Sequence, residues 1–306
     1  MNTQKRSKFK RVKKFQRGLK QEYLDQLKTR GKLSFLRNTS LLGGDIDIQF
    51  RDNYINLYYK GSSLMMFRWN NSSEYTVNIS EAYFDPIPPA VLDRMSFKYS
   101  GKKEKMRRYN FNDRSIIKLK DNFKDVVAQL KRNIRYLGKG KENAFEQIFI
   151  ENNTRVSQGK IPEFIILDRQ VVVSGLDRLD LISISKLPNS SKYRLNLVEL
   201  KYGEDRRIPD VHDKQLKKYY DAFWADYDNI IDVYANIIKQ KKDIGRWTYG
   251  DPGDFQISED PRTMRKVAVF GNIDERNPLL KQARKQFDSK TVFVVMNNII
   301  STDIIK

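Results

Sequence analysis

Two apolar runs of the sequence each contain an acid, and in the second run a lysine follows the acid two residues later. The runs surround a polar turn in RLDLISISKLPNSSKYRLNLVELKYG, residues 178–203, and they contain Asp180, Glu199 and Lys201. The turn is centred near residues 189 and 190, so an antiparallel hairpin places Asp180 opposite Glu199. Residues two apart in a strand share a face, so Glu199 and Lys201 point the same way. The sequence therefore predicts two carboxylates and one ammonium converging on one patch of a hairpin.

This combination of groups suits metal-assisted hydrolysis. Two buried carboxylates side by side are costly unless a cation lies between them. The side chains of Asp180 and Glu199, with a nearby backbone carbonyl such as that of Leu200, offer the hard oxygen ligands that Mg²⁺ or Mn²⁺ prefers. Lys201 would activate or orient a water and offset charge on a pentacovalent phosphate. We therefore expect a site for phosphodiester hydrolysis on this hairpin.

Two helices flank the predicted hairpin and carry further polar residues. The segment NAFEQIFIENN before it places Glu146 among apolar residues. The segment KQLKKYYDAF after it carries Gln215 and Tyr219 four residues apart, on one helix face. Further candidate strands, EFIILD, RKVAVFGNI and TVFVVMN, alternate with helical patterns, which predicts an α/β arrangement around a mixed sheet.

RLDLI followed by a turn and VELKYG resembles the core motif of the PD-(D/E)XK nuclease superfamily, with Asp on one strand and Glu-x-Lys on the next. The resemblance spans roughly residues 143–220, about a quarter of the chain. It implies a restriction-endonuclease-like fold and a Mg²⁺- or Mn²⁺-dependent nuclease, with DNA favoured over RNA because most of the family cuts DNA. In that family an acid on the preceding helix usually completes the metal shell, which implies this role for Glu146, directly or through water. A Gln on the following helix, as in several branches, implies that Gln215 orients Lys201 or the nucleophile.

Two assignments stay open at this stage. VSGLDRLDL contains Asp177 as well as Asp180. The helicase-associated branch of the family often uses the first acid of such a pattern, whereas the turn-centred register favours Asp180. On the preceding helix, Glu142 and Glu151 lie near Glu146, and the apolar neighbours of Glu146 favour it as the inward-facing acid.

The remaining sequence predicts the organisation of the chain. Residues 1–32 are dense in Lys and Arg, and we expect a basic arm that is either solvated or in contact with phosphate. Residues 33–111 alternate short apolar runs with turn sequences, which is typical of a small antiparallel sheet. Its aromatic residues would form a core or stack on unpaired bases. Residues 112–306 form the expected nuclease-like α/β domain, so the fold class is α+β overall.

The composition narrows the classes of function. The 306 residues include 58 Lys and Arg against 38 Asp and Glu, a net charge of +20, which attracts polyanions such as nucleic acid. There is no Cys and a single His, His212, so thiolate zinc sites and His-rich metal sites are excluded. No apolar run approaches the ~20 residues of a membrane span, and we expect a soluble cytoplasmic protein without a membrane partner.

Two rival classes of function fit the same charge. One is a non-catalytic nucleic-acid-binding protein built on a degenerate nuclease fold, and the other is a structural or partner-binding protein of a mobile element. A degenerate domain usually loses the lysine or one acid, whereas this sequence keeps Asp180, Glu199 and Lys201. The nuclease is therefore the favoured hypothesis. Nucleases that cut both strands of a duplex are commonly dimers, so we expect either a monomer or a homodimer.

Overall fold

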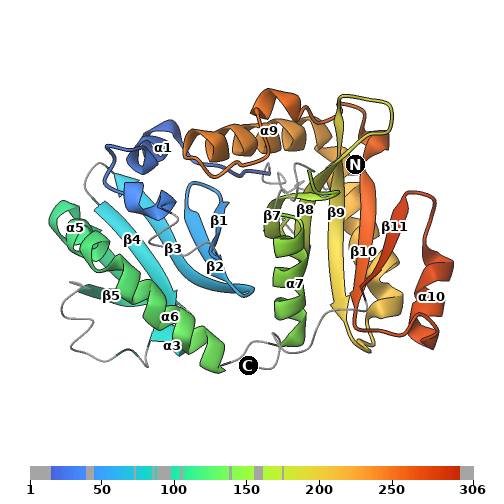
Figure 1. The fold of residues 1–306 in the computed structure, drawn as a ribbon, viewed down its shortest axis with the longest axis horizontal. Helices are drawn as coiled ribbons and strands as arrows, with labels where there is room; N and C mark the ends of the chain where they lie inside the picture. Colours follow the sequence, from blue (N-terminus) through green and yellow to red (C-terminus); the bar gives the residue numbers. More distant parts are fainter. Residues whose placement is uncertain are drawn as a thin grey trace, which may run out of the picture.

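Two β-sheets form the framework of the protein (Figure 1). The structure is a computed structural model, and it describes residues 15–38, 45–71, 74–84, 87, 98–103, 106–137, 140–154, 161–173 and 176–296. Helix α7 lies between the two sheets, and helix α9 runs along one end of both (Figure 1). This mixture of two sheets with surrounding helices makes the protein α+β.

The first sheet is antiparallel and six-stranded, in the order β1-β2-β3-β4-β6-β5. Its strands are β1 (Asp47–Phe50), β2 (Ile55–Tyr59), β3 (Ser62–Asn71), β4 (Glu74–Ser80), β5 (Lys98–Lys103) and β6 (Met106–Asn112). Turn residues separate short apolar runs in this part of the sequence, and hairpin pairing follows. The antiparallel sheet predicted here is confirmed.

The described part of the expected basic arm is structured and packed. Helix α1 (Gln21–Leu27) buries Tyr23, Leu24 and Leu27 in the core of the first sheet, and Leu19 precedes them there. These apolar side chains recur at helical spacing and outweigh the surrounding lysines, because their burial removes apolar surface from water. The arm, which we expected to be solvated or in contact with phosphate, is therefore packed over its described part, where Phe15 also contacts the core of the second sheet, while residues 1–14 lie outside the described residues.

Two helices predicted to belong to the second half instead cover the first sheet. They are α5 (Asp113–Asp121) and α6 (Phe123–Leu137). Asn112 starts α5 with a capping box. The Ser115 backbone N–H donates a hydrogen bond to the Asn112 side chain, and the Asn112 backbone N–H donates one to the Ser115 hydroxyl. Ile116, Leu119 and Phe123 are then buried in the first core. Helices α5 and α6 therefore pack in the core of the first sheet, whereas the expected boundary near residue 112 grouped them with the second half.

The second sheet is mixed and five-stranded, in the order β11-β10-β9-β8-β7. Its strands are β7 (Ile165–Val172), β8 (Arg178–Lys186), β9 (Tyr193–Tyr202), β10 (Arg265–Gly271) and β11 (Thr291–Met296). The three strands β7, β8 and β9 pair antiparallel, whereas β9, β10 and β11 pair parallel. The mixed sheet predicted for this half is confirmed.

Helices cover both faces of the second sheet. Helix α7 (Lys141–Asn152) packs Phe145 and Phe149 against one face, and it comes very close to β10 at Gly271, where a Cβ would lie 2.6 Å from the Phe145 ring. The opposite face is covered by α8 (Lys217–Ala225), α9 (Tyr227–Asp243) and α10 (Pro278–Gln286). Among the described residues, no helix has both the length and the apolar character needed to cross a membrane.

Candidate active site

The β8–β9 hairpin has the register expected from its turn. Leu181 pairs with Val198, so the next position along each strand sets Asp180 opposite Glu199. The Leu200 backbone N–H donates a 2.8 Å hydrogen bond to Asp180 Oδ2. The two carboxylates therefore meet near the C-terminal end of β9.

Lys201 lies beside Glu199 in a buried setting. Both side chains are only 2% exposed. Lys201 Nζ is 2.6 Å from Glu199 Oε1 and donates a second bond of 3.2 Å to the Leu200 carbonyl. Glu199 Oε2 is buried and has no hydrogen-bond partner among the described residues. Lys201 thus pairs with one oxygen of Glu199 and leaves the other without a hydrogen-bond partner among the described residues.

The electrostatics of the cluster follow from this shortage of positive charge. Burial raises the pKa of Asp180 well above its usual range, and repulsion from Glu199 and Glu146 raises it further. Burial likewise raises the pKa of Glu199, which Lys201 only partly opposes. Burial alone would lower the pKa of Lys201, but attraction to Glu199 and Asp180 outweighs it and raises that pKa. The site therefore favours a protonated carboxyl or an added cation.

Two acids of α7, Glu142 and Glu146, lie near the hairpin. They are four residues apart and therefore share one face of the helix. Glu146 is 4% exposed and lies near enough to Asp180 to raise its pKa. Glu142 lies at the rim with 43% of its side chain exposed, and its Oε1 is 3.6 Å from Lys201 Nζ. Glu151 accepts a hydrogen bond from the Gln147 side chain, away from these contacts.

Glu146 is also held by an arginine that the sequence analysis did not single out. Arg169 of β7 is fully buried, and its Nη2 and Nε lie 2.8 Å and 3.0 Å from Glu146 Oε1. Gln170 Nε2 donates a long bond of 3.5 Å to Glu146 Oε2. Glu146 therefore forms an ion pair with Arg169. The sequence marks Arg169 in the same way as Asp180, because each is a charged residue inside an apolar run that forms a strand. The run that contains Arg169 is IILDRQVV.

The helix after the hairpin brings its polar residues toward the same end of β9. Residues Val211–Leu216 form a π-helical turn that continues into α8, and π-turns are frequent at functional sites. Within it Gln215 Oε1 is buried and lacks a hydrogen-bond partner among the described residues, as does the Tyr219 hydroxyl. Burial raises the pKa of Tyr219, with further contributions from Glu199, Asp177 and Asp180. No hydrogen bond joins Gln215 to the described acids.

The two candidate aspartates lie in different settings. Asp177 precedes β8 and is exposed, whereas Asp180 lies within the strand and accepts the Leu200 N–H. Among the described residues, no group of three or more His, Cys, Asp or Glu is arranged to hold a metal ion. The donors that do converge are two carboxylates and one carbonyl. The unpaired Glu199 Oε2 and the raised pKa of both acids fit a divalent cation at this position.

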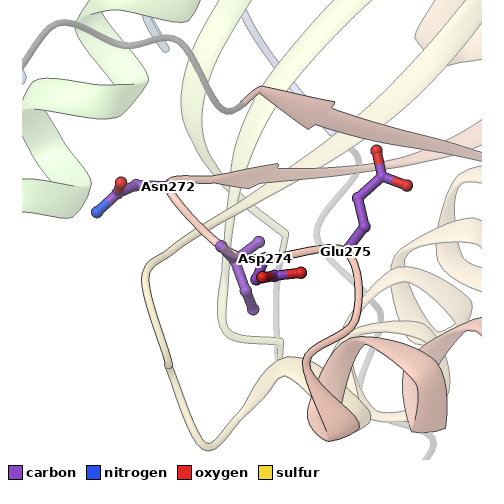
Figure 2. A pocket seen from close by; sticks show the side chains of 4 residues that line it. Asn272, Asp274 and Glu275 are labelled. Atoms are coloured by element: carbon purple, nitrogen blue, oxygen red, sulfur yellow. The ribbon is translucent and has the colours of Figure 1, made fainter.

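A hollow opens next to the end of the hairpin, after β10. Asn272, Ile273, Asp274 and Glu275 line it, and Figure 2 shows the three polar side chains along the segment that leaves the strand. The Gly203 N–H donates a 2.8 Å bond to the Gly271 carbonyl, which joins this segment to the end of β9. Hydrogen bonds from Arg276 lower the pKa of Asp274 to about 2. Asp274 pairs with Arg276 and Glu275 with Arg284, so the negative charge of the hollow is balanced by these two arginines.

No protein-family model, curated protein or solved structure matches the chain. The chemistry of the site therefore rests on its own residues and contacts.

Proposed function

We propose that this protein is a nuclease that hydrolyses phosphodiester bonds, in DNA before RNA, with a bound Mg²⁺ or Mn²⁺. The observation that carries the proposal is the half-buried Asp180 beside the buried Glu199, whose Oε1 pairs with Lys201 and whose Oε2 has no partner among the described residues. A purely structural cluster would be expected to satisfy both acids, since an unpaired buried carboxylate oxygen is costly.

The second sheet supports a restriction-endonuclease-like fold for this half. Its hairpin β8–β9 carries Asp and then Glu-x-Lys, β10 continues the sheet in parallel to β9, and α7 packs against one face. Glu199 and Lys201 share the strand face of Leu197, which packs with Leu216 and Tyr219 of the following helix. This is the placement that the resemblance to the PD-(D/E)XK superfamily requires.

Each residue of the site has a role in the proposed reaction. Asp180, Glu199 and the Leu200 carbonyl would hold the cation, which when bound neutralises charge on the phosphate and promotes loss of a proton from the attacking water. Lys201 would hold that water and balance the charge that develops on the phosphate. The water oxygen forms a new bond to phosphorus, one ester P–O bond breaks, and the proton from the water ends on the leaving oxygen.

Two further residues would act around this centre. Glu146 completes the shell through water and not directly, because its Oε1 is engaged by Arg169. Gln215 brings a buried amide oxygen without a partner, which suits a residue that orients Lys201 or the water. Both roles are those that the family resemblance implies.

A cleavage assay tests the proposal. Linear, circular, single- and double-stranded DNA and RNA would be incubated with Mg²⁺ or Mn²⁺ and with the wild type, Asp180→Ala, Lys201→Ala or Asp177→Ala. We expect the wild type and Asp177→Ala to cleave DNA, and the other two variants to lose about 10²–10⁴-fold in rate. Loss with Asp177→Ala alone would move the ligand to that residue.

The alternative is a nucleic-acid-binding protein without catalysis. Two observations favour it: the close ion pair between Lys201 and Glu199, and the lack of a third metal-binding side chain among the described residues. This alternative predicts no cleavage by any form, with binding to DNA that divalent metal does not change.

A further inference from the structure

The positive charge of the chain is concentrated in its first part. Residues 1–141, which run to the start of α7, contain 32 Lys and Arg and 13 Asp and Glu, a net charge of +19. Residues 142–306, which contain the candidate site, have 26 Lys and Arg and 25 Asp and Glu, a net charge of +1. The attraction of a polyanion is therefore a property of the first part and not of the hairpin that would cut it.

Helices α5 and α6 present one exposed part of this charge. Lys118, Lys120, Lys124 and Arg132 are exposed, and none forms an ion pair with a described residue. We call these four residues and the exposed Tyr136 the α5–α6 face. Figure 1 shows the two helices along the outer side of the first sheet. Side-chain cations that lack acidic partners are the groups that exchange counterions for phosphates.

This face ends close to the candidate site. Helix α6 stops at Leu137 and α7 begins at Lys141, so the two ends lie at most about 14 Å apart. Lys141 is exposed, and the next residue, Glu142, has its Oε1 3.6 Å from Lys201 Nζ. The last turn of α6 therefore lies beside the rim of the site.

An aromatic ring stands at that end of the face. Tyr136 is 89% exposed, the highest value among the exposed large hydrophobic residues, and no aromatic ring among the described residues stacks on it. A ring in this position is available to a base, and stacking on an aromatic side chain holds unpaired bases whatever their sequence.

We infer that the α5–α6 face binds the backbone of a nucleic-acid strand and that Tyr136 stacks on an unpaired base as the strand reaches the site. The substrate then contains a single-stranded segment, as an end, a flap or a whole strand. This inference deepens the proposed function, which supplies the cleavage at Asp180 and Glu199. The binding itself requires no catalysis.

Binding of labelled oligonucleotides in EDTA tests the face separately from cleavage. The probes are a single strand, a blunt duplex and a duplex with a single-stranded flap, each over a series of salt concentrations. We expect Lys124→Glu/Arg132→Glu to weaken binding of the single strand at least tenfold. The slope of the logarithm of the binding constant against the logarithm of the salt concentration should become shallower by about 1.4, because each of the two lost phosphate contacts contributes about 0.7. The control is Lys239→Glu/Lys285→Glu, an equal charge change at two exposed helix lysines of the second half, with less than twofold effect.

The stacking step has its own variant. Tyr136→Ala should weaken the single strand and the flap at least fivefold and leave the blunt duplex unchanged, because only unpaired bases reach the ring. Three results would overturn the inference. The control pair could weaken binding as much as the face variants do, the wild type could bind none of the probes, or the protein could bind anionic vesicles in preference to the oligonucleotides. Specific loss by the face variants without cleavage by any form would sustain the binding face and reject the nuclease.

Discussion

Neighbouring strands of the second sheet carry two buried ionic clusters that are built in opposite ways. The site cluster is Asp180, Glu199 and Lys201, in which two acids share one cation. The junction cluster joins the two sheets through β7 and sets three acids against three arginines; its members are Asp47, Glu146, Asp168, Arg17, Arg51 and Arg169.

Asp168 shows how completely the junction cluster is paired. It is fully buried and forms ion pairs with Arg17, whose Nε is 2.9 Å away, and with Arg51. It also accepts a hydrogen bond of 2.8 Å from the Arg169 backbone N–H, and Tyr234 donates a longer one of 3.4 Å. The contacts with Arg17, Arg51 and Tyr234 join three other parts of the chain to β7. Such a cluster locks the two sheets together.

Arg169 completes the same junction from the next position of β7. Its Nη1 is 3.1 Å from Gln147 Oε1 and 3.5 Å from Asp47 Oδ2, and its guanidinium lies 4.7 Å from the ring centre of Tyr58. The arginine thus connects α7 with β1 and β2 of the first sheet. In this cluster each acid has an arginine as ion-pair partner, which favours a structural role, whereas the excess of acids in the site cluster favours the binding of a ligand.

Removing the central acid of the junction cluster should have the largest effect on stability. Asp168→Ala leaves Arg17 and Arg51 without their carboxylate in a buried setting. We expect the free energy of unfolding to fall by about 3–5 kcal/mol, as for other buried pairs that lose one partner. Urea unfolding followed by circular dichroism measures this change.

Asp177→Ala is the matched control, because Asp177 is an exposed aspartate on the segment before β8. It should leave the unfolding curve unchanged within error. Equal stability of the Asp168 variant and the wild type would mean that the junction does not hold the sheets together.

Glu146 belongs to the junction cluster but also repels Asp180 of the site cluster, and its substitution decides which of the two interactions dominates its effect on stability. Glu146→Gln keeps an acceptor for Arg169 but removes the charge, so we expect a loss of about 1.5–3 kcal/mol, typical of a hydrogen bond to a charged group. If repulsion from Asp180 dominated instead, the variant would be more stable than the wild type. The sign of the change in unfolding free energy is therefore the measurement.

The same variant tests how Glu146 relates to a cation. With Arg169 holding its carboxylate, Glu146→Gln should still show a rise in melting temperature when Mn²⁺ is added. Loss of that rise, in a variant that folds, would make Glu146 a direct ligand.

The sequence predicted the hairpin and the placement of its charged residues because these depend on local information. Strand periodicity and the position of the turn determine the register, and so place Asp180 opposite Glu199 and Glu199 beside Lys201. The mixed sheet also followed, from the alternation of strand and helix patterns. These features need no knowledge of which segments pack together.

The sequence could not predict contacts between distant segments. Helices α5 and α6 have amphipathic patterns that would fit either sheet, and only packing assigns them to the first core. Arg17 and Asp168 are 151 residues apart, and nothing local to either specifies the pairing. Glu142 looked like a solvated helix acid, but the start of α7 brings it to the site rim beside Lys201.

The smallest expected effect, and the one of opposite sign, comes from neutralising an acid of the site cluster. Folding raises the pKa of Asp180 above its unfolded value near 4, so the folded protein holds the proton more tightly than the unfolded chain. In metal-free protein, stability therefore falls as pH rises from about 4 through the raised pKa. Asp180→Asn escapes this loss and should be more stable than the wild type by roughly 1–2 kcal/mol at pH 8, with no gain below pH 4.

Added cation should reverse that order. Mn²⁺ should bind the folded wild type and raise its melting temperature, increasingly so as the pH rises toward 8 and protons leave Asp180 and Glu199. Asp180→Asn retains an oxygen for the Leu200 N–H but loses the charge that attracts the cation, so its melting temperature should not respond. Thermal melts in EDTA and in Mn²⁺ across this pH range measure both effects. If Asp180→Asn is less stable than the wild type in EDTA, Asp180 belongs with the paired, structural acids such as Asp168. The reason is that the loss of a charge stabilises the protein only where the acid has no cationic partner.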